Sequence, residues 1–296
     1  MPCPPSAGFP GSGPALAIDI GGTKLAAGLV DGQGRLTDRR STPTPATDDP
    51  EVVFRALAGL LDGLALEDAV VCGIGCGGPM EPGGEEVSTL HIPAFRAFPL
   101  RSRVADATRL VTFVDNDAKA LARGEGWVGA AAGQDDFIAM VVSTGVGGGI
   151  FLDGRLLDGR AGNAGHIGHV VVVPDGRECF CGGRGCLEAE TSGRAIAAMT
   201  GQPPAEAGPE VIARTGTFVG RAVASVANLL DLPLAVVAGS VALGFGEPFF
   251  AAAQAEIDAL SRLDFSRGTR IVPAGLGDAG PLIGAAAVGF AGLASN

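Results

Sequence analysis

Basic residues are scarce in this sequence. Its 296 residues include 21 Lys and Arg against 32 Asp and Glu, which gives a formal net charge of -11. Nucleic-acid-binding proteins carry a basic surface, and proteins that adhere to anionic membranes need one too. The acidic balance therefore argues against both kinds of partner, while it favours solubility and says little about the fold.

Long apolar stretches are also missing. The most apolar segment, residues 281–294, is too short and too rich in glycine to span a bilayer, so we expect a buried terminal helix there. Residues 1–14 lack the basic start and apolar centre of a secretory signal and are predicted to form a flexible tail. Six cysteines without such a signal favour a reducing, cytoplasmic location.

Apolar runs that alternate with helical patterns predict an α/β protein with room for two domains. We expect strands at residues 15–20, 25–30, 35–41, 70–75, 111–114, 137–143, 149–152, 234–238 and near 271. We expect helices from about residue 50, from 117 towards 127, and at 191–199, 211–230 and 245–260.

One strand–turn–strand pattern occurs twice. In both copies an Asp-Gly turn follows the second strand, at Asp31 and at Asp153, and an Arg-Leu pair follows soon after. This indicates one supersecondary unit used twice, in halves that face each other across a cleft. We place a small domain at residues 15–115 together with the helix at 281–296, and a large domain at 116–280.

Histidine is rare, with three copies in the chain, and one of them has three cysteines close by. The spacing is His-x9-Cys-x-Cys-x4-Cys, within the segment 166–188, and the four residues are His169, Cys179, Cys181 and Cys186. Four such ligands match a tetrahedral structural zinc site. Two alternatives are a disulfide, which Cys-x-Cys disfavours, and unrelated core thiols. Cys3, Cys72 and Cys76 belong to no motif and are expected to be inert.

Two glycine-rich turns follow strands in matching frames. The first, residues 21–24, comes directly after Asp19, and the second is residues 144–149. Their backbone N–H groups could hold phosphate oxygens, with Asp19 as a partner of Mg²⁺, although a hairpin turn explains the first glycine pair equally well. Neither turn has Walker spacing and neither begins a helix, so a P-loop or a Rossmann site is not indicated.

A run of Asp115, Asn116 and Asp117 stands where a strand meets a helix. A helix N-cap is one explanation. The functional explanation makes Asp117 a general base and Asn116 a donor to substrate, as phosphoryl transfer requires. His166 and Glu188 lie close in sequence to the predicted metal ligands and are candidates to meet sugar hydroxyls, although His166 could instead be structural.

Together these motifs resemble the ROK family of sugar kinases and repressors, from Ala15 onward. The runs AIDIGGTK, NDA, STGVGGG and AGSV appear in the family's order around the zinc motif. The resemblance implies an actin-like (ribonuclease H-like) ATPase fold with two domains around a central cleft and a zinc-binding loop. It also implies structural Zn²⁺, Mg²⁺ with ATP, and a homodimer. Residues 1–14 leave no room for a DNA-binding helix-turn-helix, which disfavours the repressor branch.

The resemblance also assigns residues by position. It implies Asp117 as catalytic base and a sugar site formed by Gly78, His91, Asn116, Asp117, His166, His169 and Glu188. It implies an ATP site formed by Asp19, Gly21, Gly22, Thr23, Lys24, Thr144, Gly145, Val146, Gly147, Gly148, Gly239 and Ser240.

Two positions depart from the glucokinase pattern of the family. His166 stands where those enzymes typically have Glu, as it does in the bacterial N-acetylmannosamine kinases, which the AGHIGH run also resembles. His91 stands where many relatives have a sugar-binding Asn. The sequence therefore predicts a kinase for the 6-hydroxyl of a hexose, with N-acetylmannosamine as the first choice. Glucose or another hexose is the alternative, and a sugar-binding regulator without catalysis is a third reading.

Overall fold

The computed structural model describes residue 9 and residues 13–295. These form two compact units. Unit 1 runs up to Gly133 and also contains Asp158–Ala164 and the chain from Leu276 onward, whereas unit 2 comprises Gln134–Leu157 and Gly165–Gly275. Most of the predicted tail at residues 1–14 lies outside the described residues. Within it, the ring of Phe9 stacks on that of Phe290, with centroids 5.1 Å apart.

Unit 1 is built on a five-stranded sheet in the order β3-β2-β1-β4-β5. Its strands are β1 (Ala15–Ile20), β2 (Lys24–Val30), β3 (Leu36–Pro43), β4 (Val71–Cys76) and β5 (Thr112–Asn116). The first three pair antiparallel as a meander, β4 pairs parallel with β1, and β5 pairs parallel with β4. The parallel strands place the carboxyl ends of β1, β4 and β5 at one edge of the sheet.

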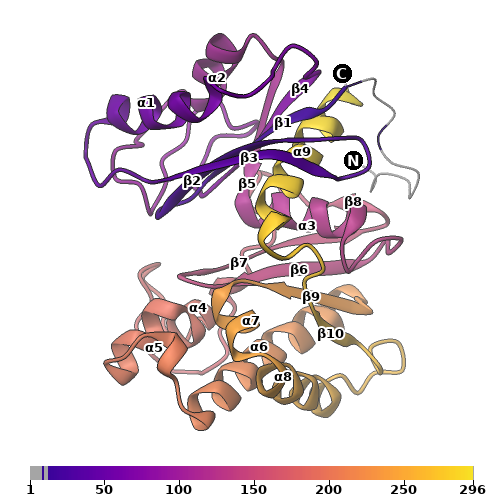
Figure 1. Ribbon diagram of the computed structural model, residues 1–296. Coiled ribbons are helices and arrows are strands. Elements are labelled where there is room, and N and C mark those ends of the chain that lie inside the picture. The colour runs from indigo at the N-terminus through magenta and orange to yellow at the C-terminus, as the bar shows by residue number, and fades with distance from the viewer. Residues whose placement is uncertain (1–8, 10–12, 296) are drawn as a thin grey trace. The chain divides into compact units, whose positions relative to one another are not determined.

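Alternation along β1 separates two cores in unit 1. Leu16, Ile18 and Ile20 point into the core shared with α1 (Pro50–Leu61) and α2 (Leu100–Thr108). Ala15 and Ala17 point to the opposite face, where α9 (Gly280–Leu293) packs (Figure 1). The small side chains on that face allow close approach, and a Cβ on Gly73 would overlap the carbonyl of Ala285. Because successive side chains of a strand point to opposite faces of the sheet, each face of the sheet packs against a different helix layer.

Unit 2 carries a second five-stranded sheet in the order β10-β9-β6-β7-β8. Its strands are β6 (Phe137–Val142), β7 (Val146–Leu152), β8 (Arg155–Leu156), β9 (Leu234–Ala238) and β10 (Arg270–Pro273). Helices α6 (Pro209–Leu230) and α8 (Glu247–Leu260) contribute Val219, Val223 and Ile257 to the core on one face of this sheet (Figure 1).

The predicted internal repeat is confirmed at the level of topology. In each unit the first strand pairs antiparallel with the second and parallel with the fourth, as β1 does with β2 and β4 and β6 does with β7 and β9. The third strand pairs antiparallel with the second in both units. The predicted α/β class is likewise confirmed.

The helices expected at 191–199 and 245–260 are confirmed as α5 (Gly193–Thr200) and α8, with ends within two residues of the prediction. Helix α4 (Leu187–Thr191) was not predicted; it precedes α5, whose N-cap is Ser192. Helix α7 (Ser240–Phe245) was not predicted either, and it is separated from α8 by Gly246, whose φ of 62° favours glycine. Helix α2 was not predicted, because its polar sequence buries few residues. Three short 3₁₀ turns complete the elements: η1 (Ile167–His169), η2 (Pro204–Glu206) and η3 (Gly277–Ala279).

The boundary between the units also differs from the predicted one after Asp115. Helix α3 (Asp117–Val128) belongs to unit 1, because it packs against α9. Gly124 and Gly284 make this contact close, since a Cβ on Gly284 would overlap the carbonyl of Ala120. None of the helices in the described part of the chain has the length and hydropathy needed to cross a bilayer.

Candidate active site

The predicted base, Asp117, lies at the first position of α3, where β5 ends. Asn116 is the N-cap of this helix, and its Oδ1 accepts a hydrogen bond from the N–H of Ala118 at 3.0 Å. The N-cap explanation is therefore correct for Asn116. The carboxylate of Asp117 also accepts from Ala118, at 2.8 Å, and the residue is exposed. A carboxylate that is accessible and held at a helix N-terminus can accept a proton from a substrate hydroxyl.

Asp19 lies near this base, in a row of residues across parallel strands. It pairs with Gly75 of β4, and Gly75 pairs with Asp115 of β5. Gly75 has no side chain to separate the carboxylates, and a Cβ there would lie 4.0 Å from Oδ1 of Asp19 and 3.7 Å from Cα of Asp117. Burial and the charge of Asp117 raise the pKa of Asp19 from 3.8 to about 7. A divalent cation would relieve this unfavourable charge, so Asp19 fits the predicted role beside Mg²⁺.

The first glycine turn, residues 21–24, is exposed at the end of β1 and is fixed from two sides. The hydroxyl of Thr44 donates to the carbonyl of Gly21 at 2.6 Å, and the N–H of Thr44 donates to Thr23 at 3.1 Å. On the other side, a Cβ on Gly22 would lie 2.6 Å from the Cβ of His91. The turn is therefore held in place while its own residues stay accessible.

His91 lies exposed at a cavity of about 380 Å³ within unit 1. The lining residues are Gly22, Thr44, Pro45, Ala46, Thr47, Asp48, His91, Ile92 and Pro93. Arg96 holds the loop that carries His91, since its guanidinium donates to the carbonyls of Thr89 and Phe95 at 2.6 and 2.8 Å. Gly78 lies elsewhere in unit 1, where a Cβ would be 3.7 Å from Nδ2 of Asn116.

The second glycine turn belongs to unit 2 and joins β6 to β7. Gly239 and Ser240 lie beside it, because the hydroxyls of Ser143 and Ser240 are 3.0 Å apart. Gly239 has a φ of 101°, and a Cβ there would overlap the carbonyl of Val142. The structure thus brings together the two predicted ATP-binding segments of this unit, residues 144–148 and 239–240.

The four predicted metal ligands form one cluster, with ligand atoms within 4.8 Å of one another. Sγ of Cys181 and Sγ of Cys186 are 3.7 Å apart, as are Nδ1 of His169 and Sγ of Cys179. The edge of a zinc tetrahedron with Zn–S bonds of about 2.3 Å measures about 3.8 Å, so the cluster has the right size. The disulfide alternative is wrong, since all cysteines of the described chain are free.

His166 and Glu188 flank this cluster. Gly165 and Gly168 press the turn at η1 directly on β7, where Cβ atoms would overlap the carbonyls of Gly148 and Val146. The rings of His166 and His169 are nearly parallel, with centroids 6.2 Å apart, and His166 is exposed. Since His169 directs Nδ1 to the cluster, its Nε2 is on the other edge of the ring. Glu188 is buried, and its Oε2 accepts from the N–H of Val146 at 2.8 Å.

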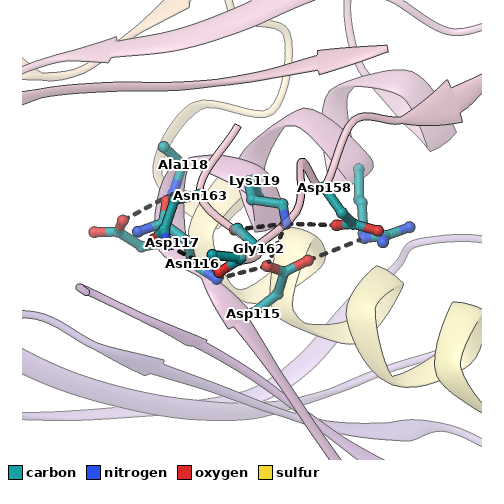
Figure 2. Close-up of polar contacts among 10 residues, drawn as sticks. Asp115, Asn116, Asp117, Ala118, Lys119, Asp158, Gly162 and Asn163 are labelled. Atoms are coloured by element: carbon teal, nitrogen blue, oxygen red, sulfur yellow. Dashed lines mark hydrogen bonds and ion pairs between the residues drawn. The ribbon is translucent and has the colours of Figure 1, made fainter. Parts of the chain in front are cut away.

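Two residues of unit 1 that contact predicted site segments of that unit were not predicted from the sequence. Thr44 fixes the first glycine turn, and the only signal for it was its place in a Pro-Thr-Pro run. Lys119 is buried in the first turn of α3 and pairs with Asp115 and Asp158 (Figure 2). Nothing in the sequence marks a lysine there as buried.

Comparison with known proteins identifies a matching family and several similar proteins. The model of the ROK family matches residues 15–289. The N-acetylmannosamine kinase of Citrobacter koseri is 39% identical over 246 residues, or 78% of this chain and 84% of its own. The ROK hexokinase of Thermus thermophilus superposes with a TM-score of 0.83 at 31% identity, over 95% of this chain and 99% of that one. A ROK glucokinase of Streptomyces griseus, solved with glucose and AMPPNP, superposes with a TM-score of 0.79 at 31% identity. The match covers 94% of this chain and 99% of that one.

Proposed function

Since the chain belongs to the ROK family and is a sugar kinase of it, we propose that it transfers the γ-phosphoryl group of ATP to the 6-hydroxyl of N-acetylmannosamine. The observation that carries the reaction is the exposed carboxylate of Asp117 at the start of α3, with Asp19 close by. The choice of sugar rests on the likeness to N-acetylmannosamine kinases and on His166, which stands where the family's glucokinases typically have Glu.

Each step of the reaction has a residue to perform it. Asn116 positions the sugar, and Asp117 accepts the proton of the 6-hydroxyl as that oxygen forms a bond to the γ-phosphorus. The bond between the γ-phosphorus and the bridging oxygen breaks, and ADP leaves. The turns at residues 21–24 and 144–148 supply backbone N–H groups to the phosphates. When bound, Mg²⁺ neutralises charge on the β- and γ-phosphates, and Asp19 would help to hold it.

His166 provides the basis for sugar selection. An imidazole donates a hydrogen bond to a hydroxyl or to an acetamide oxygen, whereas a glutamate at this position can only accept. A site that satisfies a polar group on one sugar rejects a sugar that lacks it. Glu188 contributes an acceptor to the same sugar, through the carboxylate oxygen not used by Val146. His169 contributes a donor, its Nε2–H, because its Nδ1 faces the metal cluster.

The metal cluster is proposed to hold structural zinc. His169, Cys179, Cys181 and Cys186 supply four ligands of the kind zinc prefers, at spacings that fit a closed tetrahedral site. A closed site leaves no position for substrate, so its role is to fix the backbone between His166 and Glu188. The homodimer that the resemblance implies belongs to the same proposal.

A panel of hexoses tests the substrate. The purified protein is incubated with ATP, Mg²⁺ and either N-acetylmannosamine, glucose, N-acetylglucosamine or mannose, and ADP release is followed. N-acetylmannosamine is expected to give the highest kcat/KM, and NMR of the product should place the phosphate on the 6-oxygen. Faster turnover of glucose would instead support the glucokinase alternative, which the hexokinase and glucokinase neighbours favour.

A further inference from the structure

The segment Asp158–Ala164 has an unusual place in the chain. The residues before it, up to Leu157, belong to unit 2, and so do those that follow from Gly165, but the segment itself belongs to unit 1. It ends two residues before His166, which the proposed function assigns to the sugar. The contacts that hold Asp158–Ala164 in unit 1 therefore fix the point from which the chain leads to His166.

Lys119 holds this segment. Its Nζ donates to Oδ1 of Asp158 at 2.6 Å and to the carbonyl of Gly162 at 3.3 Å. The side chain of Lys119 is only 4% exposed, whereas that of Asp158 is 61% exposed. Burial of an ammonium group costs free energy unless its N–H donors have acceptors. The buried lysine therefore needs these contacts.

The same ammonium group also contacts the turn that carries the base. Nζ lies 3.2 Å from Oδ1 of Asp115, and that oxygen accepts from the N–H of Asn116 at 2.8 Å. Figure 2 shows the ammonium between the carboxylates of Asp115 and Asp158, next to Asn116 and Asp117. Two hydrogen bonds, to Asp158 and Gly162, and an ion pair with Asp115 engage the ammonium, so its partners come from both segments.

We propose that Lys119 is a positioning residue for phosphoryl transfer. It fastens Asp158–Ala164 to the Asp115–Asn116–Asp117 turn, and so sets the start of the His166 segment relative to the base. This inference rests on the proposed function. Lys119 acts through the segment it holds, and its nitrogen is already engaged by the protein.

Lys119→Met is the main test, since methionine fills much of the same volume without the ammonium group. The variant is expected to raise KM for the sugar about tenfold and to lower kcat, with KM for ATP changed less than about twofold. Hydrogen–deuterium exchange of residues 158–166 should become faster in the variant. A purely structural role would lower the melting temperature without this division between the two substrates.

Three further variants complete the experiment. Asp158→Asn is expected to raise the sugar KM by about threefold, and the double variant should equal Lys119→Met, because the two residues act as one unit. Lys119→Arg should recover part of the loss. Arg101→Met removes an exposed ion pair with Glu85 elsewhere in unit 1 and should change neither KM.

Unchanged sugar KM and unchanged exchange in Lys119→Met would overturn the inference. If that variant fails to fold, Asp158→Asn decides, since Asp158 is mostly exposed and its loss leaves Lys119 paired with Asp115; values equal to those of the unaltered protein would overturn the inference as well. Failure of the proposed function looks different, because the unaltered protein would then phosphorylate no hexose. In that case the exchange measurement still tests whether Lys119 holds the segment.

Discussion

Oε2 of Glu188 accepts a hydrogen bond from the backbone N–H of Val146 at 2.8 Å. A residue proposed to bind the sugar is thus tied to the turn proposed to bind ATP, within unit 2. One oxygen of the carboxylate serves the turn, which leaves the other for a sugar hydroxyl. The two proposed binding sites therefore share a side chain.

Glu188 variants should separate its two contacts. Glu188→Gln keeps an oxygen that can accept from Val146, so KM for ATP is expected to change less than about twofold while KM for the sugar rises about tenfold. Glu188→Ala loses both contacts and should raise both KM values. Steady-state kinetics with each substrate varied would measure this. Glu178→Ala, at a surface ion pair of the same unit, is the control, and identical ATP kinetics in both Glu188 variants would contradict the expectation.

Asp117→Asn tests the general base. The amide has nearly the same shape but cannot accept the proton, so kcat is expected to fall at least ~10²-fold. Binding of the sugar, measured by calorimetry, should stay within a few-fold of the original. A variant that keeps most of its kcat would remove Asp117 from the reaction. A protein with no measurable rate before the substitution would point to a regulator.

Asp19 should make stability depend on pH. Its pKa is raised from 3.8 to about 7 by burial and by Asp117, so the folded state keeps a proton that the unfolded chain has lost between about pH 4 and pH 7. Stability contributed by this group is therefore present at low pH and is lost as pH rises through that window. Asp19→Asn cannot lose a proton, and its melting temperature should exceed that of the unaltered protein at pH 8.

The comparison must be made without divalent metal ions. The difference in melting temperature between Asp19→Asn and the unaltered protein should shrink as pH falls to 4. If the difference is the same at pH 4 and pH 8, the carboxyl does not titrate in the expected range. Mg²⁺ with nucleotide should narrow the difference at pH 8, because a cation stabilises the ionised form.

Metal content tests the cluster. The purified protein is expected to hold about one zinc per chain by elemental analysis, and Cys181→Ser should lose most of it and melt at a lower temperature. KM for the sugar should rise as well, because the cluster fixes the backbone between His166 and Glu188. Cys72→Ala, a buried cysteine of unit 1, is the control and should retain the metal. Full zinc content in Cys181→Ser would contradict the assignment.

His166→Glu tests sugar selection. The exchange replaces a donor by an acceptor, so the ratio of kcat/KM for N-acetylmannosamine to that for glucose is expected to fall at least tenfold. His166→Ala should lower the same ratio to a smaller extent. An unchanged ratio in both variants would show that His166 is only structural. The melting temperature of each variant provides the control for folding.

Local patterns in the sequence were sufficient for most of the elements, for the internal repeat and for the grouping of the metal ligands. Side chains that alternate with a period of two separate the two faces of β1. His169 and the three cysteines that cluster with it all lie within one short stretch of chain. The contact of Asn116 with α3 is equally local. Such features depend on neighbours in the chain, so the residue order alone reveals them.

Contacts between distant parts of the chain had to come from the tertiary structure. Lys119 meets Asp158 across 39 positions, and Val146 meets Glu188 across 42, so neither pair leaves a periodic trace in the sequence. The raised pKa of Asp19 has the same origin, since its burial and its closeness to the charge of Asp117 exist only in the folded chain. The sequence by itself determined which residues are candidates for the chemistry. Which side chains hold them in position was decided by packing, because only folding brings those partners into contact.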